Sequence, residues 1–414
     1  MMSAWPKVKL ADYVELLAGF PFKSEHYTDN PDDVALVKGE NVSQGRILWD
    51  ISKRWRIADF AQLQKFQLVL GDVVVAMDRP WVPAGLKWAF IRERDPQALL
   101  VQRCARLRPK HESLDHGFLR FVIGGSGFES YVKPITTGVN IPHISGQQIL
   151  NYEFTLPPIS TQRRIAGVLS AYDDLIENNQ RRIRILEEMA RSLYREWFVH
   201  FRYPCHKSVP LTDSPLGPIP QGWEVRNVKD LANVTYGCAL KSQSFNTDGN
   251  GLPVVRIRNI PTGASETYSA EECDVKYQIN NGHILVGMDG DFHMCIWSNG
   301  LALQNQRVAR FESQGEIGNY HLFLALERPI QEFNMAIVGT TVAHLGDMHI
   351  KTIPIIWPRS ALRKKAKEIL EPLSEQIIVL KRQTANLRRT RDLLLPRLLS
   401  GQVVLAADIP PVTA

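Results

Sequence analysis

Two kinds of apolar pattern alternate along the chain. Short runs rich in β-branched residues, such as Val73–Ala76 and Val254–Ile257, are bounded by Gly, Asn, Asp and Pro and predict strands. Two much longer segments place apolar residues at alternating steps of four and three, which is the a/d pattern of a coiled coil. The pattern therefore predicts α/β or α+β globular regions, each followed by one long helix.

The first long seam begins after Pro157 and Pro158 and continues for about four heptads. Its members are Ile165, Leu169, Tyr172, Ile176, Asn179, Ile183, Leu186, Ala190, Leu193 and Trp197. The second seam lies 201 residues further on, in the same register. Its members are Ala366, Leu370, Leu373, Ile377, Leu380, Thr384, Leu387, Arg391, Leu394 and Leu398, of which Thr384 and Arg391 are the weak positions.

Because the two seams match in length, we expect the helices to bury them against each other as an antiparallel pair. At ~1.5 Å per residue the first seam is roughly 50 Å long. Asn179 either fixes the register of the pair or is a surface residue at a helix irregularity. Pro372 and Pro396 interrupt the second pattern, and we expect a kink or a break at each.

The globular regions are copies of each other. Trp5–Tyr27 matches Trp223–Phe245 without a gap, which aligns Gly19 with Gly237. Three later matches follow with smaller offsets: Gly71–Asp78 with Gly282–Asp289, Gln102–Leu107 with Gln306–Phe311, and His143 with His344. The changing offsets indicate loops of different length. A tandem repeat of this kind predicts a pseudo-two-fold arrangement with two similar but non-identical sites in one chain.

These patterns divide the chain into six parts. We expect two similar globular domains, each followed by a helix, with a Pro-rich linker between the first helix and the second domain and a frayed tail at the end. The expected boundaries are 1–157 and 223–357 for the domains, 158–200 and 358–401 for the helices, 201–222 for the linker and 402–414 for the tail.

Composition narrows the class of protein only slightly. The 414 residues are 44% hydrophobic and 22% charged, which is ordinary for a folded globular chain, and the net charge of +6 permits a polyanionic partner. No run of about 18 apolar residues indicates a membrane span, and the N-terminus lacks an apolar signal core. We therefore expect a cytoplasmic protein. The five cysteines are odd in number and form no CxxC pair, so neither a zinc site nor a disulfide framework is expected.

Familiar catalytic motifs do not occur in the sequence. There is no phosphate-binding GxxxxGK[ST] loop, no HExxH and no GxSxG nucleophile elbow, and Asp289-Gly290-Asp291 is interpreted as a turn. His143 and His344 occupy equivalent places, but neither has an acid or a nucleophile near it in the sequence. The sequence therefore predicts a chain that is not an enzyme by itself and that holds no metal or cofactor.

The remaining signal is a set of polar and basic residues that recur in both copies. Arg, Asn and Gln can contact base edges, while Lys, Ser and Thr commonly hold phosphates, so we expect these residues to bind double-stranded DNA. The alternative is that they are turn and strand-end residues kept for folding. The candidates are Lys23, Ser24, Lys38, Asn41, Gln102, Arg103, Thr136, Thr137 and His143 in the first copy, and Lys241, Ser242, Arg256, Arg258, Asn259, Gln306, Arg307, Thr340, Thr341 and His344 in the second.

Three further segments, in this order, resemble the specificity subunit of type I restriction–modification systems. Leu156–Asn179 resembles the first conserved helical region, Ser214–Trp223 the linker into the second target recognition domain, and Leu394–Val403 the end of the second helical region. The resemblance covers nearly the whole chain. Two departures are Thr161-Gln162, where the family often has Glu-Gln, and the strongly basic stretch Arg359–Lys367.

The resemblance implies two target recognition domains, each binding one half of a split, asymmetric DNA site. It also implies that the helical pair sets the spacing of the halves and docks two methyltransferase subunits, with restriction subunits joining through that complex. The partners would supply the cofactors. Two other hypotheses remain: a coiled-coil scaffold that binds proteins without DNA specificity, and a nuclease or methyltransferase with an unfamiliar site.

Overall fold

The computed structural model describes residues 5–83, 85–136, 142–336, 344–403 and 405. The chain forms two compact units. Unit 1 comprises Met1–Leu175 and Leu387–Ala414, and unit 2 comprises Ile176–Asn386. Each unit therefore contains one globular domain together with a portion of both long helices.

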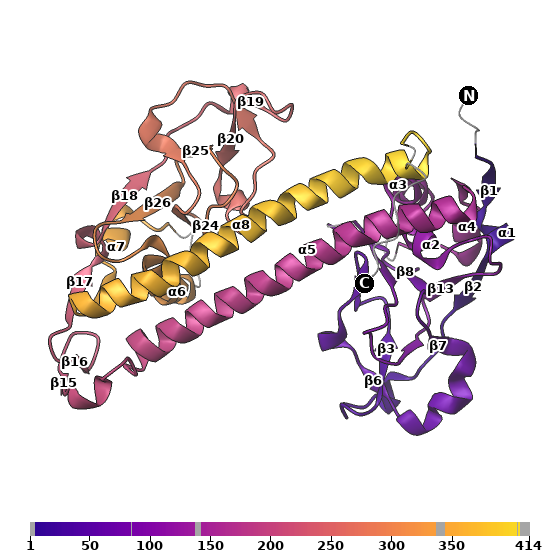
Figure 1. The fold of residues 1–414 in the computed structure, drawn as a ribbon, viewed down its shortest axis with the longest axis horizontal. Helices are drawn as coiled ribbons and strands as arrows, with labels where there is room; N and C mark the ends of the chain where they lie inside the picture. Colours follow the sequence, from indigo (N-terminus) through magenta and orange to yellow (C-terminus); the bar gives the residue numbers. More distant parts are fainter. Residues whose placement is uncertain (1–4, 84, 137–141, 337–343, 404, 406–414) are drawn as a thin grey trace. The chain divides into compact units, whose positions relative to one another are not determined.

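Unit 1 contains two four-stranded sheets. The first is fully antiparallel, in the order β11-β8-β13-β2, and helices pack on one of its faces (Figure 1). Its strands are β11 (Trp88–Phe90), β8 (Val73–Ala76), β13 (Cys104–Pro109) and β2 (Val14–Ala18). The packed helices are α2 (His116–Ile123), α3 (Ser126–Ile135) and α4 (Gly146–Leu150).

The second sheet of unit 1 has the order β6-β3-β12-β7 and contains one parallel pair, β3 with β12. Its strands are β6 (Arg54–Trp55), β3 (Val34–Val37), β12 (Ala98–Leu100) and β7 (Gln67–Leu68). The successive residues of β8 explain how the two sheets share a core. Val73 and Val75 join the helix-facing core, whereas Val74 joins Val37 and Leu100 in the core of the second sheet. This is the two-residue alternation of a strand buried on both faces.

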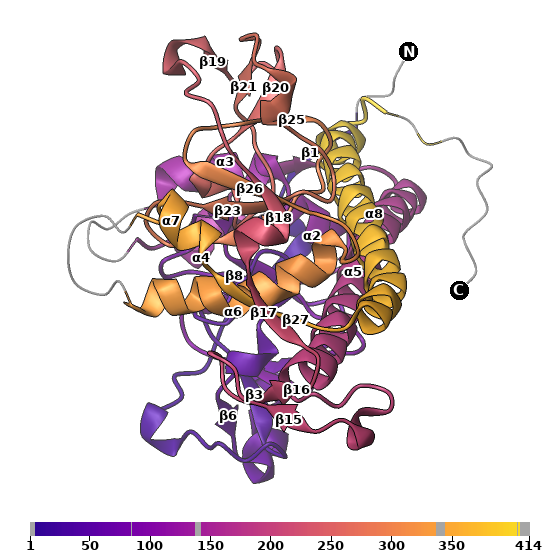
Figure 2. The same cartoon turned by 90° about the vertical axis from the view of Figure 1, so that its left-hand side faces the viewer.

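Unit 2 repeats this architecture. Its first sheet has the order β18-β26-β23-β24 and is also fully antiparallel, with α6 (Asn319–Ala336) and α7 (Asp347–Lys351) on one side (Figure 2). Its second sheet has the order β19-β21-β20-β25-β22, with one parallel pair, β20 with β25. The strands of the first sheet are β18 (Ala232–Tyr236), β26 (Val308–Ser313), β23 (Ile284–Gly287) and β24 (Met294–Ile296). Those of the second are β19 (Phe245–Asn246), β21 (Tyr268–Ser269), β20 (Leu252–Val255), β25 (Ala302–Gln304) and β22 (Gln278–Ile279).

The strand orders confirm the internal repeat. β2, β8 and β13 in unit 1 occupy the same places as β18, β23 and β26 in unit 2, and the parallel pair recurs. The repeated glycine has a packing role in both copies, because a Cβ on Gly19 or Gly237 would overlap the backbone carbonyl of Val101 or Asn305. Each unit closes with the same strand pair, β1 (Lys7–Lys9) with β14 (Glu153–Thr155) and β17 (Glu224–Asn227) with β27 (Pro354–Trp357).

The two long segments are helices α5 (Ile159–Tyr194) and α8 (Ser360–Leu399), and α5 ends in a π-helical turn, Arg195–Val199. Of the kink or break expected at Pro372 and Pro396, a break is ruled out, because α8 continues through both residues. The missing proline N–H removes only one intrahelical hydrogen bond, and the packing of the apolar seam on both sides maintains the helix.

The helices pair in the antiparallel sense. In unit 1 the first part of α5 meets the last part of α8, where Arg391 donates to Asp173 at 2.8 Å. In unit 2 the later part of α5 meets the earlier part of α8, where Lys381 lies 3.0 Å from Glu187. Every seam position on both helices is buried or half-buried, including the polar residues Asn179 and Thr384. The Thr384 hydroxyl donates to the Leu380 carbonyl, which satisfies it inside the helix.

Candidate functional site

A cluster of three side chains lies beyond the end of β8 in unit 1. Asp78 follows the strand by two residues and forms an antiparallel bridge with His143. Its Oδ1 is 2.6 Å from His143 Nδ1, and its Oδ2 is 2.9 Å from Arg103 Nη1. An ionised carboxylate can only accept, so His143 Nδ1 carries a hydrogen and donates the hydrogen bond to Asp78. We call these three residues the Asp78 cluster.

The same cluster recurs beyond the end of β23 in unit 2. Asp289 forms an antiparallel bridge with His344, whose Nδ1 is 2.6 Å from Oδ1 of the acid. Arg307 lies 3.3 Å from Oδ2 of Asp289. We call Asp289, Arg307 and His344 the Asp289 cluster. In both clusters the acid therefore divides its two oxygens between one histidine and one arginine.

The acid is the recessed member of each cluster. The Asp78 side chain is 20% exposed, whereas Arg103 is 63% and His143 is 43% exposed. The Asp289 cluster shows the same order, at 25%, 53% and 47% for Asp289, Arg307 and His344. Each aspartate thus holds two nitrogen-rich side chains that face solvent.

Sequence reasoning found the histidines and arginines but missed the acids. The conclusion that neither His143 nor His344 has an acidic partner was wrong, because Asp78 is 65 residues from His143 and Asp289 is 55 residues from His344 in the chain. Sheet topology brings these distant positions together. The available signal was the repeat itself, since the matched segments Gly71–Asp78 and Gly282–Asp289 both end in this acid.

The paired asparagines have a folding role. Asn41 is fully buried; its Oδ1 accepts from the Lys38 backbone N–H at 2.9 Å and its Nδ2 donates to the Leu36 carbonyl at 2.9 Å. The expected DNA contact of Asn41 is therefore corrected, because both faces of its amide are occupied inside the protein. Asn259 makes the equivalent turn, with Oδ1 accepting from the Arg256 backbone N–H at 3.0 Å.

The basic residues beside these turns differ in availability. The Lys38 ammonium lies 2.7 Å from Glu40 and is largely covered. The Arg256 guanidinium lies 5.2 Å from the centre of the Phe245 ring and donates to the Thr267 hydroxyl, and burial lowers its pKa. Arg258 is exposed. Only Arg258 of these three has a freely presented charge.

The remaining candidates are mostly exposed. Lys23-Ser24 and Lys241-Ser242 begin equivalent single turns of 3-10 helix on the surface of their units, and Gln102 and Gln306 are also exposed. The Thr136 hydroxyl instead donates to the Val132 carbonyl at 2.9 Å and accepts from the Trp81 indole at 3.3 Å. Thr137, Thr340 and Thr341 lie outside the described residues. DNA contacts by the exposed residues stay predictions.

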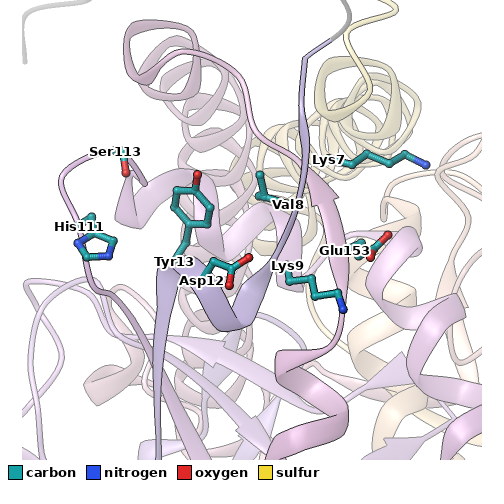
Figure 3. Close-up of a pocket in the computed structure, with 8 residues that line it drawn as sticks. All are labelled: Lys7, Val8, Lys9, Asp12, Tyr13, His111, Ser113 and Glu153. Atoms are coloured by element: carbon teal, nitrogen blue, oxygen red, sulfur yellow. The ribbon is translucent and has the colours of Figure 1, made fainter.

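Unit 1 also contains an open groove of about 730 Å³ that includes none of the predicted residues (Figure 3). Lys7, Lys9, Asp12 and Tyr13 line one side of it, and His111 and Ser113 line the other. Its walls carry both signs of charge and few apolar groups, so it lacks the apolar lining of a small-molecule site. Within the described ranges no group of three or more His, Cys, Asp or Glu side chains could hold a metal ion.

No helix in the described part of the chain has the length and apolar character needed to cross a bilayer. The two matching halves of the chain agree with one family. The chain belongs to the family defined by the Type I restriction modification DNA specificity domain, whose model matches residues 2–188 and again residues 220–389. It thus carries two copies of this domain, one in each half of the repeat.

The similar proteins are specificity subunits of type I restriction enzymes. The chain is 25% identical to the type I restriction enzyme MjaIX specificity subunit of Methanocaldococcus jannaschii, over 69% of this chain and 68% of that protein. It is 20% identical to the HindI specificity subunit of Haemophilus influenzae, over 97% of this chain and all of that one. The crystal structure of the type I restriction-modification S subunit from M. genitalium has the same fold, with a TM-score of 0.63 at 17% identity and 97% of each chain covered.

Proposed function

We propose that this chain is the DNA specificity subunit of a type I restriction–modification complex, in which each globular domain recognises one half of a bipartite site. The single observation that carries the proposal is that the DNA specificity domain model matches the chain twice, on two units of the same strand order. Two copies with different loops suit a site whose halves differ. A scaffold without DNA specificity gives no reason for two copies of this domain.

The proposal extends to partners and chemistry. Methyltransferase subunits, two per chain, dock on α5 and α8, and restriction subunits join through that complex. The chain itself is non-catalytic, and its contribution is to select the DNA sequence. The absence of catalytic motifs from the sequence supports this assignment.

The test uses the chain together with its methyltransferase subunit. Base-resolved mapping of DNA methylation in cells that express the complex should give one bipartite sequence, and deletion of this chain should abolish it. Replacing residues 1–157 with those of a different specificity subunit should change one half of that sequence and leave the other intact. Methylation that is unaffected by deletion would overturn the proposal, and methyl transfer by the purified chain alone would show that it is an enzyme.

A DNA-binding measurement separates this function from the scaffold hypothesis. The complex should bind a duplex carrying the mapped site with an affinity that falls steeply as salt rises, because phosphate neutralisation releases counterions. A complex that assembles fully but shows no salt-dependent affinity for this duplex would favour the scaffold.

A further inference from the structure

The Asp78 and Asp289 clusters are surface features that the two domains share in residue type and in the way the acid divides its two oxygens. We propose that Arg103 with His143, and Arg307 with His344, bind backbone phosphates of DNA, and that Asp78 and Asp289 are positioning residues that aim them. The proposal rests on the proposed function and names the chemical group that these two sites contact.

The identity of the clusters in the two copies indicates what kind of group they bind. Domains that recognise different half-sites need different base contacts, so residues that read bases should differ between the copies. The three members of each cluster are instead identical, with the same oxygen of Asp assigned to the same partner. A phosphate is the same at every position of a duplex, and contacts to it fix the position of a protein without carrying sequence information. Identical sites in divergent copies therefore suit phosphate.

Equivalent neighbours do differ, which sharpens the contrast. In the repeat, Lys38 and Glu40 align with Arg256 and Arg258, so this turn reverses a charge between the copies. The Asn that follows, Asn41 or Asn259, keeps its backbone contact in both units. Between the two copies, the turn therefore keeps its backbone contact but changes its charge. The clusters instead keep both the contacts of the acid and the types of charged residue.

The geometry supports an oriented donor set. The Arg103 guanidinium gives one nitrogen to Asp78 and remains 63% exposed, so further N–H groups stay available to an anion. Arg103 also has a left-handed backbone conformation, with φ of 69°, a constrained placement for a residue that is not glycine; Arg307 does not share it. His143 uses Nδ1 on Asp78, so its Nε2 is the ring nitrogen left for a ligand, and it donates to a phosphate when the ring is doubly protonated.

The charge balance explains why the aspartate does not repel the ligand. It is the least exposed member of each cluster, and its two oxygens are already occupied by the arginine and the histidine. Only a doubly protonated imidazolium has an Nε2–H that can donate to a phosphate; in that form each cluster has a net charge of +1, and with a neutral histidine the arginine is the donor that remains. In unit 1 the exposed Arg79, directly after Asp78, adds one positive charge.

The experiment measures affinity against salt for the complex with its methyltransferase subunit. Arg103→Gln and Arg307→Gln are each compared with wild type on the cognate duplex and on duplexes with one altered half-site. We expect each variant to lose about 3- to 10-fold in affinity on every duplex alike, and the slope of log Kd against log salt to fall by about one. The methylated sequence should not change.

Two arginines outside the clusters serve as matched controls. Arg56 in unit 1 pairs with Asp59, and Arg328 in unit 2 pairs with Glu332; both are well exposed. Arg56→Gln and Arg328→Gln should leave both the affinity and the slope within error.

The positioning role is tested with Asp78→Asn, alone and combined with Arg103→Gln. If Asp78 acts only by aiming its two partners, the Asp78→Asn/Arg103→Gln double variant should lose no more affinity than Arg103→Gln and His143→Gln lose when their separate effects are added.

The outcomes separate the claims. Loss confined to the cognate duplex, with a relaxed methylation sequence, would show base reading and overturn the phosphate assignment. Unchanged affinity and slope in both Arg variants would show that the clusters only stabilise the fold. If Asp78→Asn fails to fold, the two Arg variants, whose side chains are exposed, still decide. A wild-type complex that binds no duplex refutes the proposed function itself.

Discussion

Arg391 of α8 donates to the carboxylate of Asp173 on α5 at 2.8 Å within unit 1. Arg391 occupies a seam position that a coiled coil normally fills with an apolar residue. Asp173 accommodates it, and its second oxygen accepts from Arg120 of α2 at 2.9 Å. The Arg120 side chain is 10% exposed and lies over the rings of Phe90 and Phe121. One carboxylate therefore connects both long helices to the globular part of this unit.

We predict that Asp173→Ala destabilises unit 1 by about 2–4 kcal/mol, because it leaves the buried charge of Arg120 without its acid. Burial already lowers the pKa of Arg120, so this guanidinium depends on a partner. Urea unfolding followed by circular dichroism measures the change. Asp392→Ala is the control: it removes another acid that contacts Arg391, but Asp392 is 61% exposed and the change should stay below about 0.5 kcal/mol. Equal effects of the two substitutions would contradict this account.

His321 makes unit 2 sensitive to acid. It is 2% exposed on α6, with ring centroids 5.5 Å from Tyr194 and 4.5 Å from Phe198, and burial lowers its pKa to about 4 from an ordinary 6.5. The unfolded chain therefore takes up a proton at this site before the folded chain does. The stability that neutral His321 preserves is complete above pH ~6.5 and is lost as the pH falls towards 4.

The expected loss from this residue is about 2.5 kcal/mol between pH 7 and pH 4.5, which follows from the two pKa values at ~1.4 kcal/mol per pH unit. His321→Phe should flatten this part of the pH dependence. Urea unfolding at both pH values tests the prediction. A wild-type and a His321→Phe protein with parallel pH profiles would refute it.

The parts of the fold that could be predicted are those governed by local period. The seams of α5 and α8 follow from spacing alone, and the repeat predicted two domains of one architecture. The acids of the two clusters could not be predicted in the same way. Asp78 meets Arg103 and His143 only because strand order places the ends of distant segments together, and local pattern does not encode strand order. Asn41 shows the reverse error, since a polar residue between a strand and a turn looks accessible in sequence and is fully buried.

Pro372 lies on the exposed side of α8 and costs the helix stability. It has no N–H for the carbonyl of Glu368, one turn earlier, yet the helix continues through it. Pro372→Ala should therefore stabilise unit 2 by about 1–3 kcal/mol, as measured by urea unfolding. Gln376→Ala, at an exposed position one turn later, should change stability by less than about 0.5 kcal/mol. A destabilised Pro372→Ala protein would show that the proline shapes the helix in a way that packing requires.

Substituting the repeated glycines Gly19 and Gly237 by alanine should lower stability, whereas the same substitution at Gly167 should raise it. Gly19 and Gly237 each follow the first strand of their sheet at a point where a second backbone segment passes, and a Cβ there would overlap a carbonyl group rather than a movable side chain. Gly19→Ala and Gly237→Ala should each destabilise their own unit by about 1–3 kcal/mol or more.

At Gly167, inside α5, an added Cβ would meet nothing within 4 Å. Gly167→Ala should stabilise the helix by about 0.5–1 kcal/mol, because alanine loses less backbone entropy there. Thermal unfolding of the three variants is sufficient, and a gain in stability at Gly19 or Gly237 would show that the close approach of the two segments does not exist in solution.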